Sequence, residues 1–421
     1  MRRDPRRLMM IHPLRFPLLL IAIFCIVPTI SHGAPVKTGA EVVAEERFQP
    51  LAGKKFGLIT NHSAVVGGVE LTKLLRAGGV APAVIFTPEH GLEGRAEDGV
   101  RLGDGLVAGI PVKSLYGATR KPRPEDLKGL DLLVFDIQDI GARFYTYIST
   151  MGLAMQAAAE AHIPFLVLDR PNPLGGEYIS GFVREELPPS FTSLYAIPVA
   201  HGMTVGELAT MVKGEEMLPG VGELELGVVR MKGWHRAMRW PDTGLSFVGT
   251  SPNIDCFDAC LFYPGTGLLE GTSASEGRGT KEPFRLVGWP GIDAQGVAER
   301  LTRLALPGVR FEAVHFTPVS MPGKSSAPRY RGKVVDGVRV TVTDYRQVLP
   351  VETGVAVLRE LWEALPPELR KGFFRKGFDD MAGSGRLRQA VEAGAGAREL
   401  FQLWDESLVG FERMRQRYLL Y

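Results

Sequence analysis

The chain has 421 residues, more than one ordinary hydrophobic core accommodates, so two domains are expected. Its composition, 45% hydrophobic and 23% charged, is typical of a soluble globular protein. The 49 basic and 47 acidic residues leave a formal net charge of only +2, which gives no electrostatic basis for a nucleic-acid partner.

The N-terminal segment has the order of a secretory signal peptide. Five arginines precede an apolar run at residues 16–30, and the small residues Ser31 and Gly33 follow it. An uncleaved anchor is the weaker alternative, because the run is short for a membrane span and contains Pro28. We therefore expect residues 1–33 to be removed and the bacterial protein to be periplasmic or secreted, without membrane insertion of the mature chain.

From residue 55 onwards, apolar runs of strand character alternate with segments of helical spacing. Strands are expected at residues 56–60, 83–86, 131–137 and 164–168, and helices at residues 71–77 and 150–162. This alternation predicts an α/β fold with a Rossmann-like, doubly wound, mainly parallel sheet. A nucleotide cofactor is not expected, because no Gly-x-Gly-x-x-Gly or Walker-type lysine loop follows the first strand.

Polar residues follow each of four predicted strands. Open α/β sheets bind ligands beyond the carboxyl ends of their strands, and those ends lie along one edge. The residues at these ends are Asn61 and His62, then Glu89 and His90, then Asp136, Gln138 and Asp139, and finally Asp169 and Arg170. We expect these side chains to converge on one site.

The strand end at residues 84–95 is the most informative. An apolar run stops at Pro88, and Glu89 and His90 follow directly, before two glycines. Proline disfavours helix before it and glycine permits unusual backbone angles, so a tight loop is predicted. A carboxylate and an imidazole there suit proton transfer, whereas the alternative is that Glu89 caps a helix or pairs with Arg95.

A proline-bearing segment at residues 187–189 suggests a domain boundary. We expect an N-terminal domain at residues 34–187 and a smaller C-terminal α/β domain at residues 188–421. The elements expected in this second half are helices at 204–214, 355–365 and 398–417 and strands at 224–231, 309–317 and 334–344. Residues 240–290 are poorly periodic and rich in Gly, Pro, Ser and Thr, which is typical of functional loops.

A glycine-rich loop at residues 263–280 carries the second group of candidate residues. These are Glu270, Thr272, Ser275, Glu276 and Arg278. Hydroxyls, carboxylates and an arginine fork are what recognition of a polar, partly anionic sugar requires. The alternative is an ordinary surface loop in which Glu276 pairs with Arg278.

Cys256 and Cys260 are the cysteines that remain after signal removal. Their spacing permits a bridge in an oxidising compartment, but two small half-buried side chains are the simpler interpretation. No metal site is expected, because no histidine stands at a zinc-finger spacing and no helical His-x-x-x-His occurs.

Six short motifs combine glycines with charged and polar residues. They are GLITN at 57–61, PEHG at 88–91, FDIQDIGARFYTY at 135–147, DRPNP at 169–173, LEGT at 269–272 and SEGRGT at 275–280. Together with the terminal YLLY, they resemble the NamZ family of exo-acting β-N-acetylmuramidases. The resemblance implies two α/β domains with a cleft between them, and release of terminal N-acetylmuramic acid from the non-reducing end of peptidoglycan fragments.

Glycoside hydrolysis usually needs two carboxyl groups, one to protonate the leaving oxygen and one to support the positive sugar or activate water. Glu89 is the expected general acid and base, because it stands in a family-like motif at a predicted strand end. The second carboxylate stays open among Asp136, Asp139, Glu270 and Glu276. A substrate-assisted route through the sugar's acetamido group also stays open.

The muramic sugar carries a lactyl carboxylate that glucosamine lacks, and arginine binds carboxylates as a fork. The candidates for this contact are Arg278 first, then Arg143, then Arg170. His62 and His90 are expected to bind sugar hydroxyls or to orient Glu89. The remaining candidates for substrate binding are Asn61, Gln138, Asp139, Asp169, Thr272 and Ser275.

Two other classes of function compete with hydrolysis of a glycoside. A non-catalytic periplasmic binding protein for cell-wall fragments would also use two lobes around a cleft, but it needs no carboxylate at the glycosidic oxygen. A serine hydrolase is disfavoured, because the sequence lacks a Gly-x-Ser-x-Gly elbow and no recognisable base lies near Ser273 or Ser275.

Overall fold

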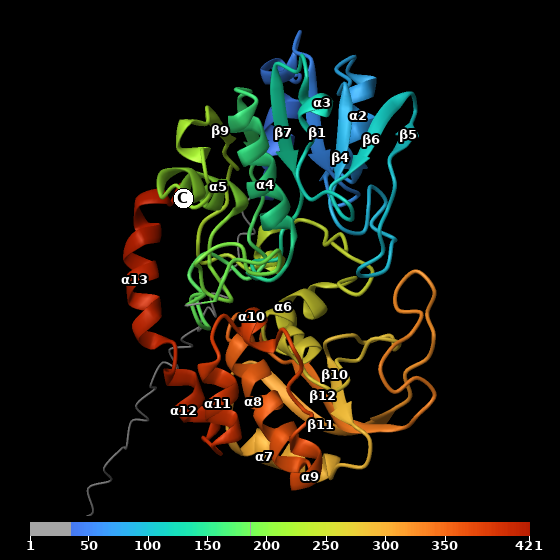
Figure 1. Cartoon of the computed structure of the whole chain (residues 1–421), viewed down its shortest axis with the longest axis vertical. Coiled ribbons are helices and arrows are strands. Elements are labelled where there is room, and N and C mark those ends of the chain that lie inside the picture. The colour runs from blue at the N-terminus through green and yellow to red at the C-terminus, as the bar shows by residue number, and fades with distance from the viewer. Residues whose placement is uncertain (1–34, 186) are drawn as a thin grey trace, which may run out of the picture. The chain divides into compact units, whose positions relative to one another are not determined.

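Seven strands form the larger sheet, in the order β5-β6-β4-β1-β7-β8-β9 (Figure 1). Their bounds are β1 Phe56–Thr60, β4 Val84–Thr87, β5 Gly105–Val107, β6 Ile110–Ser114, β7 Leu132–Asp136, β8 Phe165–Leu168 and β9 Leu226–Val229. Only β5 runs antiparallel to its neighbour. The computed structural model describes residues 35–185 and 187–421, so the expected signal peptide lies outside the described residues.

Two hydrophobic cores cover the two faces of this sheet. On one face, helices α1 (Gly39–Glu45) and α2 (Leu71–Ala77) pack against Leu58 and Val134. On the other, α4 (Tyr147–Glu160) and α5 (Val205–Gly214) pack in the cluster that contains Phe135. Strands β1, β4 and β7 are buried along their whole length, as apolar runs between two helical layers must be. The predicted Rossmann-like α/β fold is confirmed.

A smaller antiparallel sheet follows, in the order β10-β12-β11. Its strands are β10 Leu286–Trp289, β11 Val309–Phe316 and β12 Val335–Val342, and its neighbouring helices are α6 Phe257–Thr266, α7 Ala294–Arg303 and α8 Pro350–Ala364. Helices α6 and α8 approach closely at Gly265 and Gly354. A Cβ atom on Gly265 would lie 2.0 Å from the Pro350 carbonyl oxygen, so only glycine permits this crossing.

The remaining elements are short. They are α3 Pro124–Leu127, α9 Pro367–Arg370, α10 Phe378–Ala382, α11 Arg386–Glu392, the β2 Val65–Val66 and β3 Val69–Glu70 pair, and the 3₁₀ turns Gln49–Leu51, Val221–Glu223, Trp240–Thr243, Gly267–Gly271 and Gln416–Tyr418. No helix in the described part of the chain combines the length and apolarity that a membrane crossing demands.

Two predicted features differ from the structure, the domain boundary and the loop region, whereas the cysteines agree with the simpler interpretation. The chain returns to the larger sheet after residue 187, because β9 pairs in parallel with β8, so that boundary falls inside the segment that builds this sheet. The poorly periodic region at residues 240–290 contains α6, which is buried on nearly every side and therefore shows no polar face. The two cysteines, Cys256 and Cys260, lie at its start as free thiols.

The expected helix at residues 398–417 is in fact two helices, α12 (Ala397–Gln402) and α13 (Asp405–Arg415). The turn between them buries Trp404 against the Phe182 ring, with the ring centroids 5.8 Å apart. Amphipathic spacing continues through this turn, so periodicity alone did not mark it.

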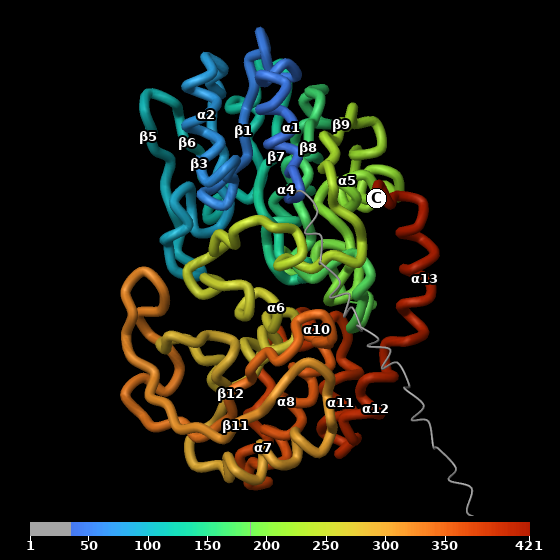
Figure 2. The backbone as a smooth tube through the Cα atoms, turned by 180° about the vertical axis from the view of Figure 1, so that it is seen from behind, coloured from blue at the N-terminus to red at the C-terminus, as the bar shows by residue number. Residues whose placement is uncertain are grey.

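Helix α13 brings the end of the chain back to the larger sheet, beside α5 (Figures 1 and 2). The Tyr421 hydroxyl donates to Asp169 Oδ2 at 2.8 Å, and the Leu420 amide donates to Glu207 Oε1 at 2.9 Å. Burial raises the pKa of Asp169 to about 6, although hydrogen bonds from Gly206, Tyr421 and Thr204 oppose this rise. Asp169 is therefore a buried anchor for the C-terminus, and the structure does not place it for substrate binding.

Candidate active site

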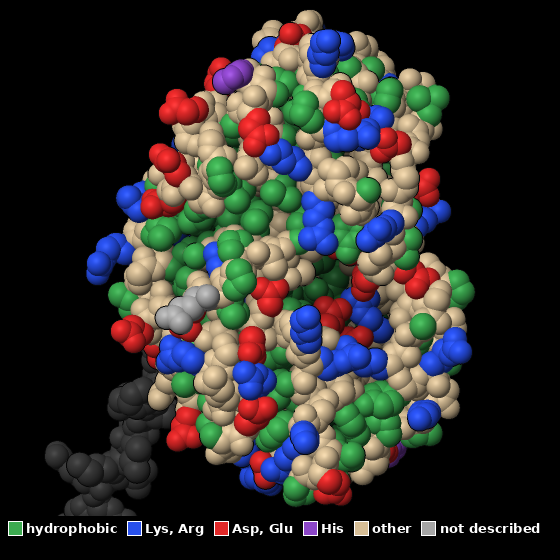
Figure 3. Space-filling model, viewed as in Figure 1, with side chains coloured by type: hydrophobic (Ala, Val, Ile, Leu, Met, Phe, Trp, Pro, Cys, Tyr) green, Lys and Arg blue, Asp and Glu red, His purple; other side chains and the backbone are tan. Residues whose placement is uncertain are grey.

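The four predicted strand ends do meet at one edge of the larger sheet, because β4, β1, β7 and β8 are neighbours. Figure 3 shows the surface hollowed on this side of the molecule, with acidic and basic side chains gathered around the hollow. A pocket of about 530 Å³ is lined by the loops after β4, β6, β7 and β8, by residues between 251 and 284, and by Met381 of α10. The loop after β1 does not reach this pocket. Of the candidates from the sequence, Glu89, His90, Glu270 and Arg278 line it.

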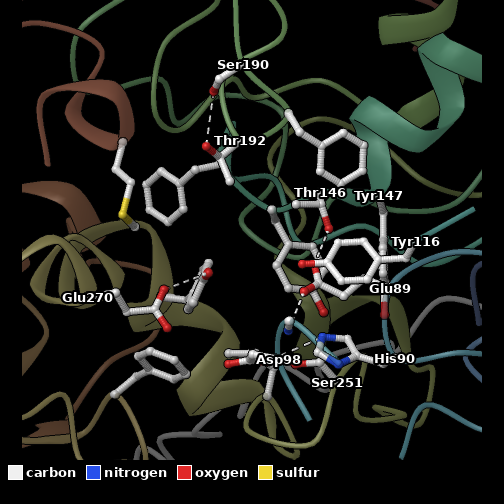
Figure 4. Close-up of a pocket in the computed structure, with 18 of the residues that line it drawn as sticks. Glu89, His90, Asp98, Tyr116, Thr146, Tyr147, Ser190, Thr192, Ser251 and Glu270 are labelled. Atoms are coloured by element: carbon white, nitrogen blue, oxygen red, sulfur yellow. Dashed lines mark hydrogen bonds and ion pairs between the residues drawn. The ribbon is translucent and has the colours of Figure 1, made fainter. Parts of the chain in front are cut away.

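Glu89 follows β4 directly after Pro88 and is half-buried at the pocket wall. Its Oε2 atom accepts a hydrogen bond of 2.8 Å from the Thr146 hydroxyl, and its Oε1 atom accepts one of 3.3 Å from the Gly99 amide. Figure 4 shows Glu89 together with Tyr116 and Thr146 on one side of the pocket, with Glu270 across from them. Glu89 does not form the ion pair with Arg95 that was the alternative interpretation.

His90 adopts a left-handed backbone conformation, with φ of 69°, which is uncommon for a residue with a side chain. Its Nδ1 atom lies 2.7 Å from the Ala96 carbonyl oxygen, so this nitrogen carries the hydrogen and donates it. Its Nε2 atom then faces Asp98 Oδ1 at 3.6 Å. The imidazole of His90 therefore lies between the backbone of its own loop and the Asp98 carboxylate of the pocket.

Arg278 lies at the centre of a cluster of carboxylates. It pairs with Asp98, with Glu270 at 2.5 Å and with Glu276 at 3.4 Å. Although burial opposes its charge, these carboxylates raise the pKa of Arg278 above its usual range. The prediction that this arginine reads a substrate carboxylate meets a physical obstacle, because three protein carboxylates already neutralise it.

Asp98 is a pocket residue that the sequence analysis missed. The surrounding protein desolvates its carboxyl group and raises its pKa, while Arg278 opposes this rise. Its side chain nevertheless lines the pocket and is 42% exposed, so a substrate can reach it. It lies in a polar loop with no strand or helix pattern around it, and no sequence signal marked it.

Asp136 and Arg170 form a buried ion pair away from the pocket lining. Arg170 Nε donates to Asp136 Oδ1 at 2.5 Å and Arg170 Nη2 donates to Oδ2 at 2.9 Å, while the two side chains are 3% and 0% exposed. A carboxylate that is completely buried in a fork and does not line the pocket cannot reach a substrate in this geometry. The structure thus argues against Asp136 as the second catalytic group and against Arg170 as the residue that binds the substrate carboxylate.

Arg143 is completely buried and also engaged. Its guanidinium donates to the backbone carbonyl oxygens of Phe182, Ile197 and Met381 at 2.6, 2.8 and 2.7 Å. Burial lowers its pKa to about 9. Arg143 therefore ties three segments of backbone together and does not face the pocket.

The other sequence candidates build loops near the pocket. Asn61 Oδ1 accepts from the Ser63 hydroxyl at 2.6 Å, and Asp139 Oδ2 accepts from the Gly141 amide at 2.7 Å. Gln138 Nε2 donates to the carbonyl oxygens of Asp139 and Pro171 at 2.7 and 2.8 Å. None of these three predicted substrate-binding side chains lines the pocket.

His62 also lies outside the pocket, in a neighbouring cavity of about 1110 Å³ that His90 shares. Its Nε2 atom lies 2.6 Å from the Gly249 carbonyl oxygen, and burial lowers its pKa. This contact joins the β1 end to the segment that leads into α6. It supports a structural role for His62.

In the glycine-rich loop, Thr272 and Ser275 support the backbone. The Thr272 hydroxyl donates to the Leu269 carbonyl oxygen at 2.8 Å, and Ser275 pairs with Gly288 through backbone hydrogen bonds. Glu276 is buried beneath the pocket lining, where burial raises its pKa despite Arg329 and Arg278. These three residues hold the loop that presents Glu270 and Arg278.

Several pocket residues belong to aromatic or loop positions that sequence reasoning did not select. They are Asp98, Tyr116, Arg120, Tyr147, Phe191 and Ser251. Burial and the nearby Glu89 carboxylate both raise the pKa of Tyr116, which keeps its hydroxyl protonated beside that group. Across residues 35–185 and 187–421, no group of three His, Cys, Asp or Glu side chains could hold a metal ion.

Comparison with known proteins agrees with this architecture. Residues 56–258 match the N-terminal domain of exo-beta-N-acetylmuramidase NamZ, and residues 261–421 match its C-terminal domain. The chain belongs to the NamZ family. The two NamZ matches meet at the start of α6, well after the boundary expected at residue 187.

Other NamZ-like proteins align along nearly the whole chain. It is 41% identical over 391 residues to the peptidoglycan beta-N-acetylmuramidase NamZ of Bacillus subtilis, covering 92% of this chain and 91% of that protein. Two crystal structures of DUF1343 family proteins from Bacteroides fragilis superpose with TM-scores of 0.83 and 0.76 at 37% and 32% identity. Each comparison covers 92% of this chain and 99% of the other.

Proposed function

We propose that this protein is an exo-β-N-acetylmuramidase, a glycoside hydrolase that releases terminal N-acetylmuramic acid from the non-reducing end of peptidoglycan fragments. Membership of the NamZ family and the 41% identity to a peptidoglycan β-N-acetylmuramidase support the substrate class. The observation that carries the chemistry is one pocket in which Glu89 lies across from Glu270 (Figure 4). Most glycoside hydrolases use two carboxyl groups that face one shared space.

Glu89 is the proposed general acid. The Thr146 hydroxyl and the Gly99 amide hold its two oxygens, so the carboxyl group is oriented before substrate arrives. This group would protonate the leaving glycosidic oxygen and later accept a proton from water.

The second carboxyl group is proposed to be Glu270. It is the remaining sequence candidate that lines the pocket, since Asp136, Asp139 and Glu276 do not. Its ion pair with Arg278 fixes its position, and a carboxylate held in this way can stabilise the positive charge that develops on the sugar ring. Asp98, on the same arginine, is the alternative for this role.

A non-catalytic binding protein for cell-wall fragments is the competing function. Sugar binding alone needs no carboxyl group at the glycosidic oxygen, whereas hydrolysis usually uses two. The three acidic side chains Glu89, Asp98 and Glu270 around one pocket therefore favour hydrolysis.

Incubation of the purified protein with a chromogenic β-N-acetylmuramic acid glycoside tests this function. We expect release of the chromophore, and release of free N-acetylmuramic acid from disaccharide fragments that carry this sugar at the non-reducing end. Tight binding of the glycoside without turnover would instead identify a binding protein.

We also propose that the protein is exported. The Arg-rich start, the apolar run and the small residues before Ala34 support a signal peptide at residues 1–33. Expression in a Gram-negative host should yield a periplasmic product whose N-terminal sequence begins at Ala34. A product that retains the apolar run would contradict this proposal.

A further inference from the structure

A cation that faces the lactyl carboxylate would favour N-acetylmuramic acid over sugars that lack this group. An incoming carboxylate would meet two acidic side chains, Asp98 and Glu270, which share the single cation Arg278. The three arginines predicted for this contact are occupied: Arg143 by backbone carbonyls, Arg170 by Asp136 and Arg278 by its carboxylate cluster. The candidate for this contact is therefore a pocket cation that no protein carboxylate neutralises.

Arg120 meets this description. It lines the same pocket from the loop between β6 and α3, and its side chain is exposed there. Its guanidinium carbon lies 4.3 Å from the centre of the Phe191 ring. Among the described residues, Arg120 forms no ion pair with a carboxylate, in contrast to its neighbours Lys121 and Arg123.

The aromatic platform beneath Arg120 is itself held in place. The hydroxyls of Ser190 and Thr192, on either side of Phe191, both donate to Asp380 Oδ2, at 2.6 and 2.9 Å. A guanidinium stacked on a fixed ring keeps its N–H edges available for a planar carboxylate. The fixed Phe191 ring thus orients the Arg120 guanidinium before substrate binds.

We propose that Arg120, stacked on Phe191, binds the lactyl carboxylate and is the residue that selects muramic over glucosamine-type sugars. This inference rests on the proposed muramidase function. It assigns the selectivity to an arginine that belongs to none of the six motifs in the sequence.

The test compares two chromogenic glycosides that differ only in the lactyl group, one with the free carboxylate and one with its uncharged carboxamide. We expect Arg120→Ala to lower kcat/KM on the carboxylate substrate about 10- to 100-fold, the range of one charge-assisted hydrogen bond. The loss on the carboxamide should be less than about threefold. Arg120→Lys should give an intermediate loss, because it keeps the charge but not the fork.

Lys121→Ala is the matched control, since it removes a positive charge one residue away that pairs with Glu160 outside this pocket. Binding of free N-acetylmuramic acid and its amide, measured by calorimetry on each variant, gives a readout that does not need turnover. Equal losses on both substrates, or no loss, would overturn the assignment to Arg120. If the wild-type protein hydrolyses neither glycoside, the proposed function fails instead.

Discussion

Glu89→Gln is expected to lower kcat on natural disaccharide fragments by about 10²- to 10⁴-fold while the fold stays intact. Glutamine has the shape of glutamate. Its carbonyl oxygen can still accept from the Gly99 amide, and its NH2 group can donate to the Thr146 hydroxyl oxygen, so the loop should keep its conformation. What the substitution removes is the proton that the leaving sugar oxygen needs.

The leaving group makes this prediction specific. Dinitrophenolate is a stable anion that leaves a glycoside without protonation. The decrease in kcat caused by Glu89→Gln should therefore be far smaller on a dinitrophenyl glycoside than on a disaccharide. Asp98→Asn is the matched control, because it neutralises another carboxyl group of the same pocket. A similar loss for Glu89→Gln on both substrates, with an unchanged melting temperature, would remove Glu89 from the role of general acid.

Arg170→Met is expected to have the largest effect on stability. It leaves the Asp136 carboxylate buried and 0% exposed without its partner. Removal of one member of a buried ion pair typically costs about 3–5 kcal/mol, which corresponds to a decrease in Tm on the order of 10 °C. Thermal unfolding followed by circular dichroism measures this decrease.

Two further variants test whether the loss of stability comes from the unpaired buried charge. The double variant Asp136→Leu with Arg170→Met removes both charges and should recover much of the lost stability. Arg388→Met breaks a half-exposed pair with Asp379 and should cost less than about 1 kcal/mol. If Arg170→Met melts like the wild type but binds the muramic sugar weakly, Arg170 would be a ligand of the substrate after all.

The local pattern of the chain predicted the four central strands of the larger sheet, β4, β1, β7 and β8, but not the edge strands β5 and β6. Strand β1 and helix α2 lie at the predicted residues, and α5 fills the predicted range 204–214, with Thr204 and Glu207 as its capping box. Such features depend on neighbours a few residues away, since apolar runs, turn residues and caps act locally. For the same reason Glu89, directly after a strand and a proline, was predicted at the mouth of a loop.

The roles of the charged residues depended on distant partners. Arg170 pairs with Asp136, which lies 34 positions earlier in the chain. Arg278 pairs with Asp98, which lies 180 positions earlier. A sequence shows which side chains can form a fork or an ion pair, but only tertiary structure determines which partner comes within hydrogen-bond distance. The role proposed for Arg120 also depends on a distant partner. Nothing in the pattern of its own loop marks this residue, and only the structure shows that its guanidinium stacks on Phe191.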